Sequence, residues 1–280
     1  MVVRLFEFFE SGPTMTTDSI AAPQGATSSS VERAFSLLEL IAAAGSDGVT
    51  LAQLSAEVST AKSTTHRYVT TLIRLGAVRR DAAGRLRLGL KLVELAGGVL
   101  ESDDLRSAAE PILRELSGTT GETVHLGLPS GGDVVYVAKV ESPQSVRLVS
   151  RIGARVPKYS SAMGKALLAA LDDAELERVL ADPREARTAN TLTSSDALRR
   201  EVEKIRSQGF AIDNEENELG VRCLGAAIVG ARAEPLGAIS VSAPASRMSL
   251  ERCHELAPTI IDAAHEIARR RGSAQAPATP

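Results

Sequence analysis

The residues from Lys62 to Arg67 carry side chains of the kinds that proteins use to contact nucleic acid. The run consists of Lys62, Ser63, Thr64, Thr65, His66 and Arg67, and it contains no carboxylate. Amines, guanidinium groups and hydroxyls bond to phosphate oxygens and to the acceptor edges of bases, whereas the phosphate backbone repels carboxylates. Such residues at a helix start also serve simply as caps or as a solvated face, so the surrounding elements have to decide between the two interpretations.

Charge is distributed very unevenly along the chain. The net charge of −3 argues by itself against a nucleic-acid partner. Residues 61–91, however, hold eight basic residues and one acidic residue, whereas residues 172–218 hold seven basic and 13 acidic residues. A local basic patch is the electrostatic signature of DNA binding. Within it, Arg85 and Arg87 alternate on a β-prone run, and we predict that they contact DNA together with Lys62–Arg67.

The elements around this run predict a winged helix-turn-helix. Apolar residues recur at helical spacing after Ser30, a second short helix follows Thr50, and a third extends from the Ser59-Thr60 break to Leu75. Two β-prone runs joined by Ala82-Ala83-Gly84 then predict a hairpin. In this motif the first turns of the third helix enter the major groove of DNA. RNA or single strands are disfavoured because the segment offers only Tyr68 for base stacking.

The rest of the chain mixes helical and β-prone segments and predicts a larger second domain of both, which makes the protein α+β. Helices are expected at Lys91–Leu105 and at Leu105–Thr119, where Pro111 predicts a kink or a new helix start. The later helices are expected at Met163–Leu171, Leu198–Gln208 and Leu250–Arg271, and the strands at Thr123–Leu128, Val134–Glu141, Val146–Ile152, Phe210–Asn214, Arg222–Val229 and Leu236–Ala243.

These elements define the expected domains. Residues 1–28 and 273–280 are predicted to be disordered, residues 29–91 to form the DNA-binding domain, 92–107 a linker helix, and 108–272 the second domain. Met15 is an alternative start. The chain contains no long uncharged apolar run and no uninterrupted signal-like stretch, so we expect no membrane association. Without a signal, the two cysteines indicate a reduced, cytoplasmic protein.

The second half offers three kinds of chemistry. Cys223 and His125 form the one plausible nucleophile–base pair, although their spacing matches no known signature. Zinc could be held by the same two residues and a carboxylate, but no Cys-x-x-Cys or His-x-x-x-His supports it. The residues Ser160-Ser161-Ala162-Met163-Gly164 precede a helix, whose free N–H groups and positive dipole end favour a small anion. A plain serine cap remains the structural alternative there.

An ordered set of motifs resembles the IclR family of bacterial transcription regulators. The resemblance covers about residues Ser30 to Arg271 with the motifs in the family's order, and the motifs are Ser30-Val31-Glu32-Arg33-Ala34, Lys62–Arg67, Arg87-Leu88-Gly89, Gly121-Glu122-Thr123-Val124-His125-Leu126, Gly164-Lys165-Ala166, Gly220-Val221-Arg222-Cys223 and Ser240–Arg247. The resemblance implies that the second domain is an α/β domain with an antiparallel sheet of the GAF/PAS-like kind. It also implies a dimer through the DNA-binding domains, often a tetramer, on a palindromic double-stranded operator.

The resemblance also implies an effector pocket between the helix start and the sheet, which would bind small carboxylates or aromatic acids. The effector contacts carried over by motif are Leu148, Ala162, Met163, Gly164, Asp213, Cys223, Ser240 and Ser242. Ser240 and Ser242 lie two apart, so on a strand they share one face. Asp213 is expected to accept a proton from a hydroxyl or hydrate of the effector.

We therefore expect a sequence-specific DNA-binding regulator whose operator binding is controlled by a small organic acid. Repression relieved by the acid is the first expectation and activation the second. No cofactor, metal or catalytic residue is expected. The alternative from another class is a ligand-binding enzyme that uses Cys223 and His125 and carries an appended DNA-binding domain.

Overall fold

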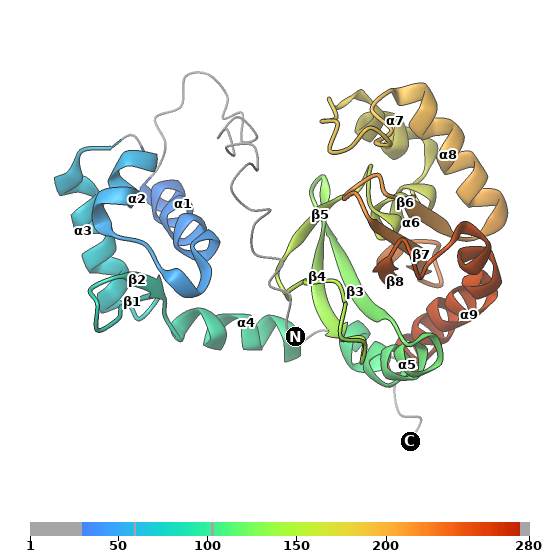
Figure 1. Cartoon of the computed structure of the whole chain (residues 1–280), viewed down its shortest axis with the longest axis horizontal. Coiled ribbons are helices and arrows are strands. Elements are labelled where there is room, and N and C mark those ends of the chain that lie inside the picture. The colour runs from blue at the N-terminus through green and yellow to red at the C-terminus, as the bar shows by residue number, and fades with distance from the viewer. Residues whose placement is uncertain (1–29, 59, 102–103, 275–280) are drawn as a thin grey trace. The chain divides into compact units, whose positions relative to one another are not determined.

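A computed structural model describes residues 30–58, 60–101 and 104–274 of the chain (Figure 1). Contacts within the chain divide it into two compact units, with the boundary between Gly97 and Gly98 inside helix α4 (Lys91–Glu101). The segment 1–28, predicted to be disordered, lies outside the described residues. Helix α9 (Leu250–Ala274) includes Ser273 and Ala274, which the prediction assigned to the tail, and the remaining tail also lies outside the described residues.

The first unit has the predicted three helices and hairpin. These are α1 (Ser30–Ala43), α2 (Leu51–Glu57), α3 (Lys62–Arg74) and the antiparallel strands β1 (Val78–Arg80) and β2 (Leu86–Leu88), with a short 3-10 turn η1 (Gly45–Asp47) after α1. Thr50 caps α2 through a reciprocal capping box with Gln53, which satisfies backbone N–H groups that the helix start leaves open. Leu37, Leu54 and Leu72 are buried in a core that the three helices share with the hairpin.

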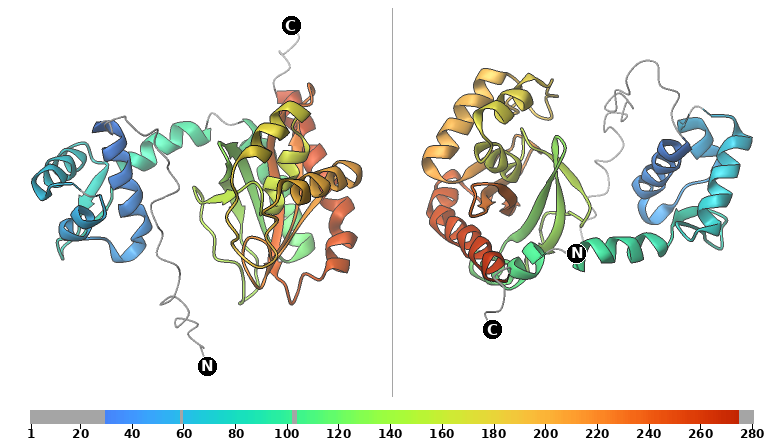
Figure 2. Two further views of the ribbon diagram at one scale, coloured as in Figure 1. Left: turned by 90° about the horizontal axis from the view of Figure 1, so that it is seen from above. Right: turned by 180° about the vertical axis from the view of Figure 1, so that it is seen from behind.

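The second unit is built on an antiparallel sheet, as predicted, and the described sheet has six strands, of which β5 was not predicted. Its strand order is β5-β4-β3-β8-β7-β6, and the strands are β3 (Thr123–Ser130), β4 (Asp133–Val140), β5 (Arg155–Pro157), β6 (Ala211–Asn214), β7 (Val221–Val229) and β8 (Pro235–Pro244). Helices α5 (Asp104–Thr120) and α9 pack on one face of this sheet (Figure 2). Helix α6 (Ala162–Ala169) packs on the other face, and α7 (Asp173–Ala181) and α8 (Ser195–Gln208) lie beyond it.

The strand predicted at Val146–Ile152 is wrong. This segment is an irregular loop between β4 and β5. Most of its apolar side chains face solvent, with Val146 68% and Val149 96% exposed, and Leu148 is partly buried. Alternating apolar residues therefore did not mark a buried strand face here. Helix α7 was missed, although Asp172 caps it and Leu176 and Leu180 give it a buried side.

Two helices fall in the range 92–107 that was predicted as a linker helix. Helix α4 is described to Glu101 and α5 from Asp104, and residues 102 and 103 lie outside the described residues. No new helix starts at Pro111, which lies inside α5. None of the helices that the structure describes combines the length and the apolar character needed to cross a membrane.

Candidate effector cavity and DNA-contacting helix

Helix α3 presents most of the predicted DNA contacts to solvent. Lys62, Ser63, His66 and Arg67 are exposed, and Thr64 is partly exposed. Thr65 is the exception, because it is completely buried and its Oγ1 lies 2.9 Å from Thr60 Oγ1. The prediction that Thr65 contacts DNA therefore does not fit this geometry. Its hydroxyl instead ties the helix start to the turn that precedes it.

The two arginines predicted for the wing bond within their own unit. Arg85 Nε and Nη2 both donate to the Gly48 carbonyl, at 3.2 and 2.8 Å, and Arg87 Nε donates to Asp81 Oδ2 at 2.9 Å. The Arg85 bonds fix the hairpin against the turn before α2, and the Arg87 bond lies within the hairpin. The exposed cations of the hairpin are Arg79 and Arg80 on β1, which were counted above only as part of the basic patch.

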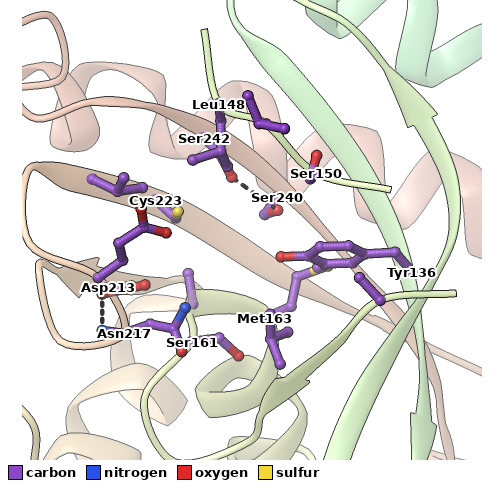
Figure 3. Close-up of a pocket in the computed structure, with 16 residues that line it drawn as sticks. Tyr136, Leu148, Ser150, Ser161, Met163, Asp213, Asn217, Cys223, Ser240 and Ser242 are labelled. Carbon is purple, nitrogen blue, oxygen red and sulfur yellow. Dashed lines mark hydrogen bonds between the residues drawn. The ribbon is translucent and has the colours of Figure 1, made fainter. Parts of the chain in front are cut away.

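A cavity of about 150 Å³ lies between the start of α6 and the sheet (Figure 3). Seven of the eight predicted effector contacts line it, namely Leu148, Ala162, Met163, Asp213, Cys223, Ser240 and Ser242. Gly164 does not line it, because this residue is packed against the backbone of Lys158 and its N–H bonds to Ser161 Oγ at 3.2 Å. A Cβ atom at Gly164 would lie 2.3 Å from Lys158 Cα, so close backbone packing requires the glycine.

The sheet register brings the polar residues of the cavity together. Ser242 is the direct neighbour of Cys223, and Cys223 is the direct neighbour of Asp213 on the next strand. Directly opposite residues of neighbouring strands share a face of the sheet, so these side chains all face α6. The residues between them, such as Leu224 and Val241, are buried in the core with α5 and α9. Alternation thus separates a polar cavity face from an apolar core face.

The start of α6 supplies hydrogen-bond donors above this face. Ser161 caps the helix by accepting from Gly164 N, and the N–H groups of Ala162 and Met163 belong to the first turn, where no helical acceptor exists. A Cβ atom at Gly225 on β7 would lie 2.8 Å from the Ala162 carbonyl carbon. Only a glycine on the strand allows the helix start to approach the sheet this closely.

Asp213 on β6 lines the cavity beside Asn217 (Figure 3). Its Oδ1 accepts from the backbone N–H of Glu216 at 2.8 Å and of Asn217 at 3.2 Å. Burial, together with the nearby charge of Glu216, raises the pKa of Asp213 to about 7. At neutral pH the carboxyl group is thus close to half protonated, so it can accept a hydrogen bond from an effector hydroxyl or donate one to an effector oxygen.

Lys165 was missed as a site residue, although it stands in the Gly164-Lys165-Ala166 motif inside an apolar helix. Its side chain is completely buried, donates to the Ile212 carbonyl at 2.6 Å and pairs with Glu216 Oε1. Glu201 Oε1 lies 3.6 Å from the same Nζ. Lys165 therefore holds β6 and the turn after it, which carries Asn217 and Glu218 into the cavity lining.

Tyr136 and Ser150 also line the cavity and were not predicted. Figure 3 shows Tyr136 on the side of the cavity opposite Asp213 and Asn217. Tyr136 stacks on His125, with ring centroids 4.4 Å apart. Their signal in the sequence was weak, since Ser150 lies in the segment predicted as a strand and Tyr136 is one of many residues on β4.

The geometry does not assemble a nucleophilic pair from Cys223 and His125. Strand β8 lies between β7 and β3, which carry the two residues, and no hydrogen bond of the described residues joins them. Burial raises the pKa of the Cys223 thiol, so the reactive thiolate is disfavoured. Within the described ranges, no three His, Cys, Asp or Glu residues gather as a possible metal site.

Comparisons with known proteins agree with this architecture. The family model for the IclR helix-turn-helix domain matches residues 30–82, and the one for the bacterial transcriptional regulator IclR C-terminal domain matches residues 97–269. The chain is 37% identical to the HTH-type transcriptional regulator KdgR of Escherichia coli (strain K12) over 246 residues, which are 87% of this chain and 93% of that protein.

Two further comparisons cover the same length. The transcriptional repressor IclR of Escherichia coli (strain K12) is 33% identical over 250 residues, 88% of this chain and 91% of that repressor. The crystal structure of IclR from Thermotoga maritima matches with a TM-score of 0.71 and 36% identity, over 86% of this chain and 98% of that one. This chain is therefore a DNA-binding transcription regulator of the IclR family, with an effector-binding C-terminal domain.

Proposed function

We propose that this regulator binds a palindromic operator through α3 and that a small organic acid in the cavity controls this binding. The observation that carries the proposal is the start of α6, where Ala162 and Met163, whose N–H groups have no helical acceptor, line a cavity with no cationic side chain among its described lining residues. The rest of its lining is apolar residues, uncharged polar groups and the carboxyl groups of Asp213 and Glu218. A helix N-terminus favours an anion through its open donors and its dipole.

The size and polarity of the cavity support a small monocarboxylate. A cavity of this volume, about 150 Å³, is comparable to one that accepts a benzene-sized molecule. The carboxylate would lie at Ala162 and Met163. Asp213 at the other side disfavours a second negative charge and suits a hydroxyl or a hydrated carbonyl. Ser240, Ser242 and Cys223 would contact the middle of the molecule from the sheet.

On the DNA side, we propose that Lys62, Ser63, Thr64, His66 and Arg67 contact the major groove. Arg79 and Arg80 would contact the backbone, while Arg85 and Arg87 support the hairpin that carries them. Because this patch is basic in a chain of net negative charge, the rest of the molecule adds little nonspecific affinity for DNA.

A dimer through the DNA-binding unit completes the proposal, with a tetramer as a further possibility. Val31 and Phe35 lie four residues apart on α1 and are more than 60% exposed, and Leu90 and Val93 at the start of α4 are exposed as well. Residues at this spacing share one helix face. Their burial between two copies would place two α3 helices on the halves of a palindrome, and avidity would raise affinity.

The acid would act by binding one arrangement of the DNA-binding units better than the other. Repression relieved by the acid is the mode we propose first. We assign no catalytic role to Cys223 or His125, and the protein would act in the cytoplasm, where its operator is found.

The test combines stability and DNA binding in the full-length protein. Glyoxylate, pyruvate and benzoate are screened by thermal shift, because a ligand that binds the folded state raises its melting temperature. An acid that binds should also change the affinity for the operator in a gel-shift titration. If none of these acids or their close analogues shifts the melting temperature, the acid-sensing proposal fails, while the DNA-binding assignment stands.

A further inference from the structure

The loop between β4 and β5 forms one wall of the cavity and is attached to the sheet at its two ends and at Ser150. Leu148, Val149 and Ser150 of this loop line the cavity. At the ends, Ser142 N donates to Thr123 Oγ1 at 3.3 Å and Gly153 N donates to the Tyr136 carbonyl at 2.8 Å. Of the described residues between these two, Ser150 is the one that hydrogen-bonds to the sheet, and it does so with both its side chain and its backbone. Ser150 therefore fixes the part of the loop that lines the cavity.

Both partners of Ser150 come from the cavity face of the sheet. His125 Nε2 on β3 lies 2.7 Å from Ser150 Oγ, and Lys139 Nζ on β4 donates to the Ser150 carbonyl at 2.8 Å. His125 and Lys139 are direct cross-strand neighbours, so they hold the loop residue from adjacent strands. The His125 ring is completely buried and stacks on Tyr136, which fixes its orientation.

The surroundings of His125 decide which way its hydrogen bond points. Burial and the nearby charge of Lys139 lower the pKa of His125 to about 3, so the ring is neutral at physiological pH. Its Nδ1 is buried and has no partner among the described residues. A buried N–H without an acceptor is rarer than a buried unpaired acceptor, so the proton belongs on Nε2. His125 then donates to Ser150, and the Ser150 hydroxyl hydrogen is left to donate to a group in the cavity.

We infer that His125 is a positioning residue for effector binding, which holds Ser150 so that its hydroxyl donates to the bound acid and the loop wall stays closed over the cavity. This inference rests on the proposed acid-sensing function and adds a third donor to the two N–H groups of α6. Ser150 makes the contact, and His125 acts through it.

The experiment measures the affinity of the full-length protein for pyruvate, glyoxylate and benzoate by isothermal titration calorimetry. Loss of one hydrogen bond to a charged group weakens binding about tenfold or more, so Ser150→Ala should raise the Kd of the best-binding acid by that factor. Ser150→Thr keeps the hydroxyl and should retain most of the affinity. Ser145→Ala, at an exposed position in the same loop, is the matched control and should leave Kd unchanged.

Substitutions at His125 separate positioning from folding. The amide nitrogen of His125→Gln can reach the place of Nε2, whereas that of His125→Asn ends near Nδ1. The glutamine variant should bind the acid nearly as well as the unmodified protein, and the asparagine variant as poorly as Ser150→Ala. In the double variant His125→Asn/Ser150→Ala, the two losses of affinity should not add, because both substitutions remove the same hydrogen bond from Ser150 to the acid.

The possible results distinguish the two proposals. If the unmodified protein binds none of the three acids, acid sensing fails and this inference fails with it. If it binds an acid and Ser150→Ala binds the acid equally well, the inference is overturned and acid sensing stands. If Ser150→Ala weakens binding but a folded His125→Asn does not, His125 has no positioning role.

Discussion

The surface proposed to contact DNA and the proposed effector cavity use polar side chains in opposite ways. On α3 the polar side chains other than Thr65 are exposed or partly exposed, and no hydrogen bond from the side chains of Lys62, His66 or Arg67 is seen among the described residues. Around the cavity, by contrast, the polar residues Lys165, Glu216 and Asp213 are buried. Lys165 donates to the Ile212 carbonyl, and Asp213 accepts from the backbone N–H of Glu216. Substitutions at the first surface should therefore change affinity alone, whereas substitutions around the cavity should also change stability.

The largest expected effect comes from Lys165→Met. Removing this buried cation leaves Glu216 buried without its partner, and breaking a buried pair from one side costs about 3–5 kcal/mol. The free energy of unfolding, measured in urea by circular dichroism, should fall by that amount. Lys204→Met on α8 is the control, because Lys204 is exposed and should change stability little. Equal stability of the two variants would show that Lys165 does not hold the turn.

A smaller loss is expected from Gly225→Ala. The added Cβ would lie 2.8 Å from the Ala162 carbonyl carbon, so the start of α6 must move away from the sheet. Overpacking of this kind costs about 1–3 kcal/mol, and the moved donors should also weaken acid binding measured by calorimetry. Gly132→Ala, where the added Cβ meets open space, should change neither quantity. If Gly225→Ala binds the acid as tightly as the unmodified protein does, the start of α6 does not recognise the anion.

At the DNA surface, Arg67→Ala and Lys62→Ala should weaken operator binding without changing stability. Each phosphate contact that is lost should reduce the slope of log K against log salt by about 0.9. Thr65→Ala should have the opposite effect. Because Thr65 is buried, this substitution should lower the melting temperature and leave the salt slope unchanged. The measurements are gel shifts at several salt concentrations and thermal melts. A salt slope that is the same in all variants would contradict the assignment of α3.

The smallest effect concerns pH. The raised pKa of Asp213 means that the folded protein retains a proton that the unfolded chain loses at about pH 4. Its contribution to stability is thus fully present below pH 4 and is lost as pH rises through about 7. Acid binding should weaken in the same direction, by at most about tenfold for each pH unit above 7, because ionised Asp213 repels an anion. Asp213→Asn should remove this dependence, and a pH profile that stays unchanged would contradict it.

The sequence predicted most of the fold because its signals were local. Thr50 before α2 and Ser161 before α6 marked helix starts that the structure confirms. The Val146–Ile152 segment misled the prediction because alternation does not reveal whether a face is covered. Strand register brings the cavity residues Ser240, Ser242 and Cys223 together. The family motifs identified these residues as candidates, whereas composition alone did not.

Other parts of the site depend on contacts between residues far apart in the sequence, which no local pattern predicts. Examples are the contact of His125 with Ser150 and that of Lys165 with Glu216. Thr65 shows the reverse case, since its residue type suits DNA contact but its place on α3 turns it toward the core. Gly164 fits the motif for the same helix start, yet packing against Lys158 is what requires it.

The thiol of Cys223 in the cavity wall has a consequence for oxidative stress. Peroxide and other electrophiles attack the thiolate, and desolvation raises the pKa of this thiol above that of an ordinary cysteine. A thiol in the cavity wall would make the regulator respond to oxidants as well as to its effector if it ionised. Although the side chain is partly exposed, we therefore expect slow labelling of Cys223 by iodoacetamide at neutral pH, measured by mass spectrometry. A sulfur that stays protonated would keep the cavity insensitive to the redox state of the cell.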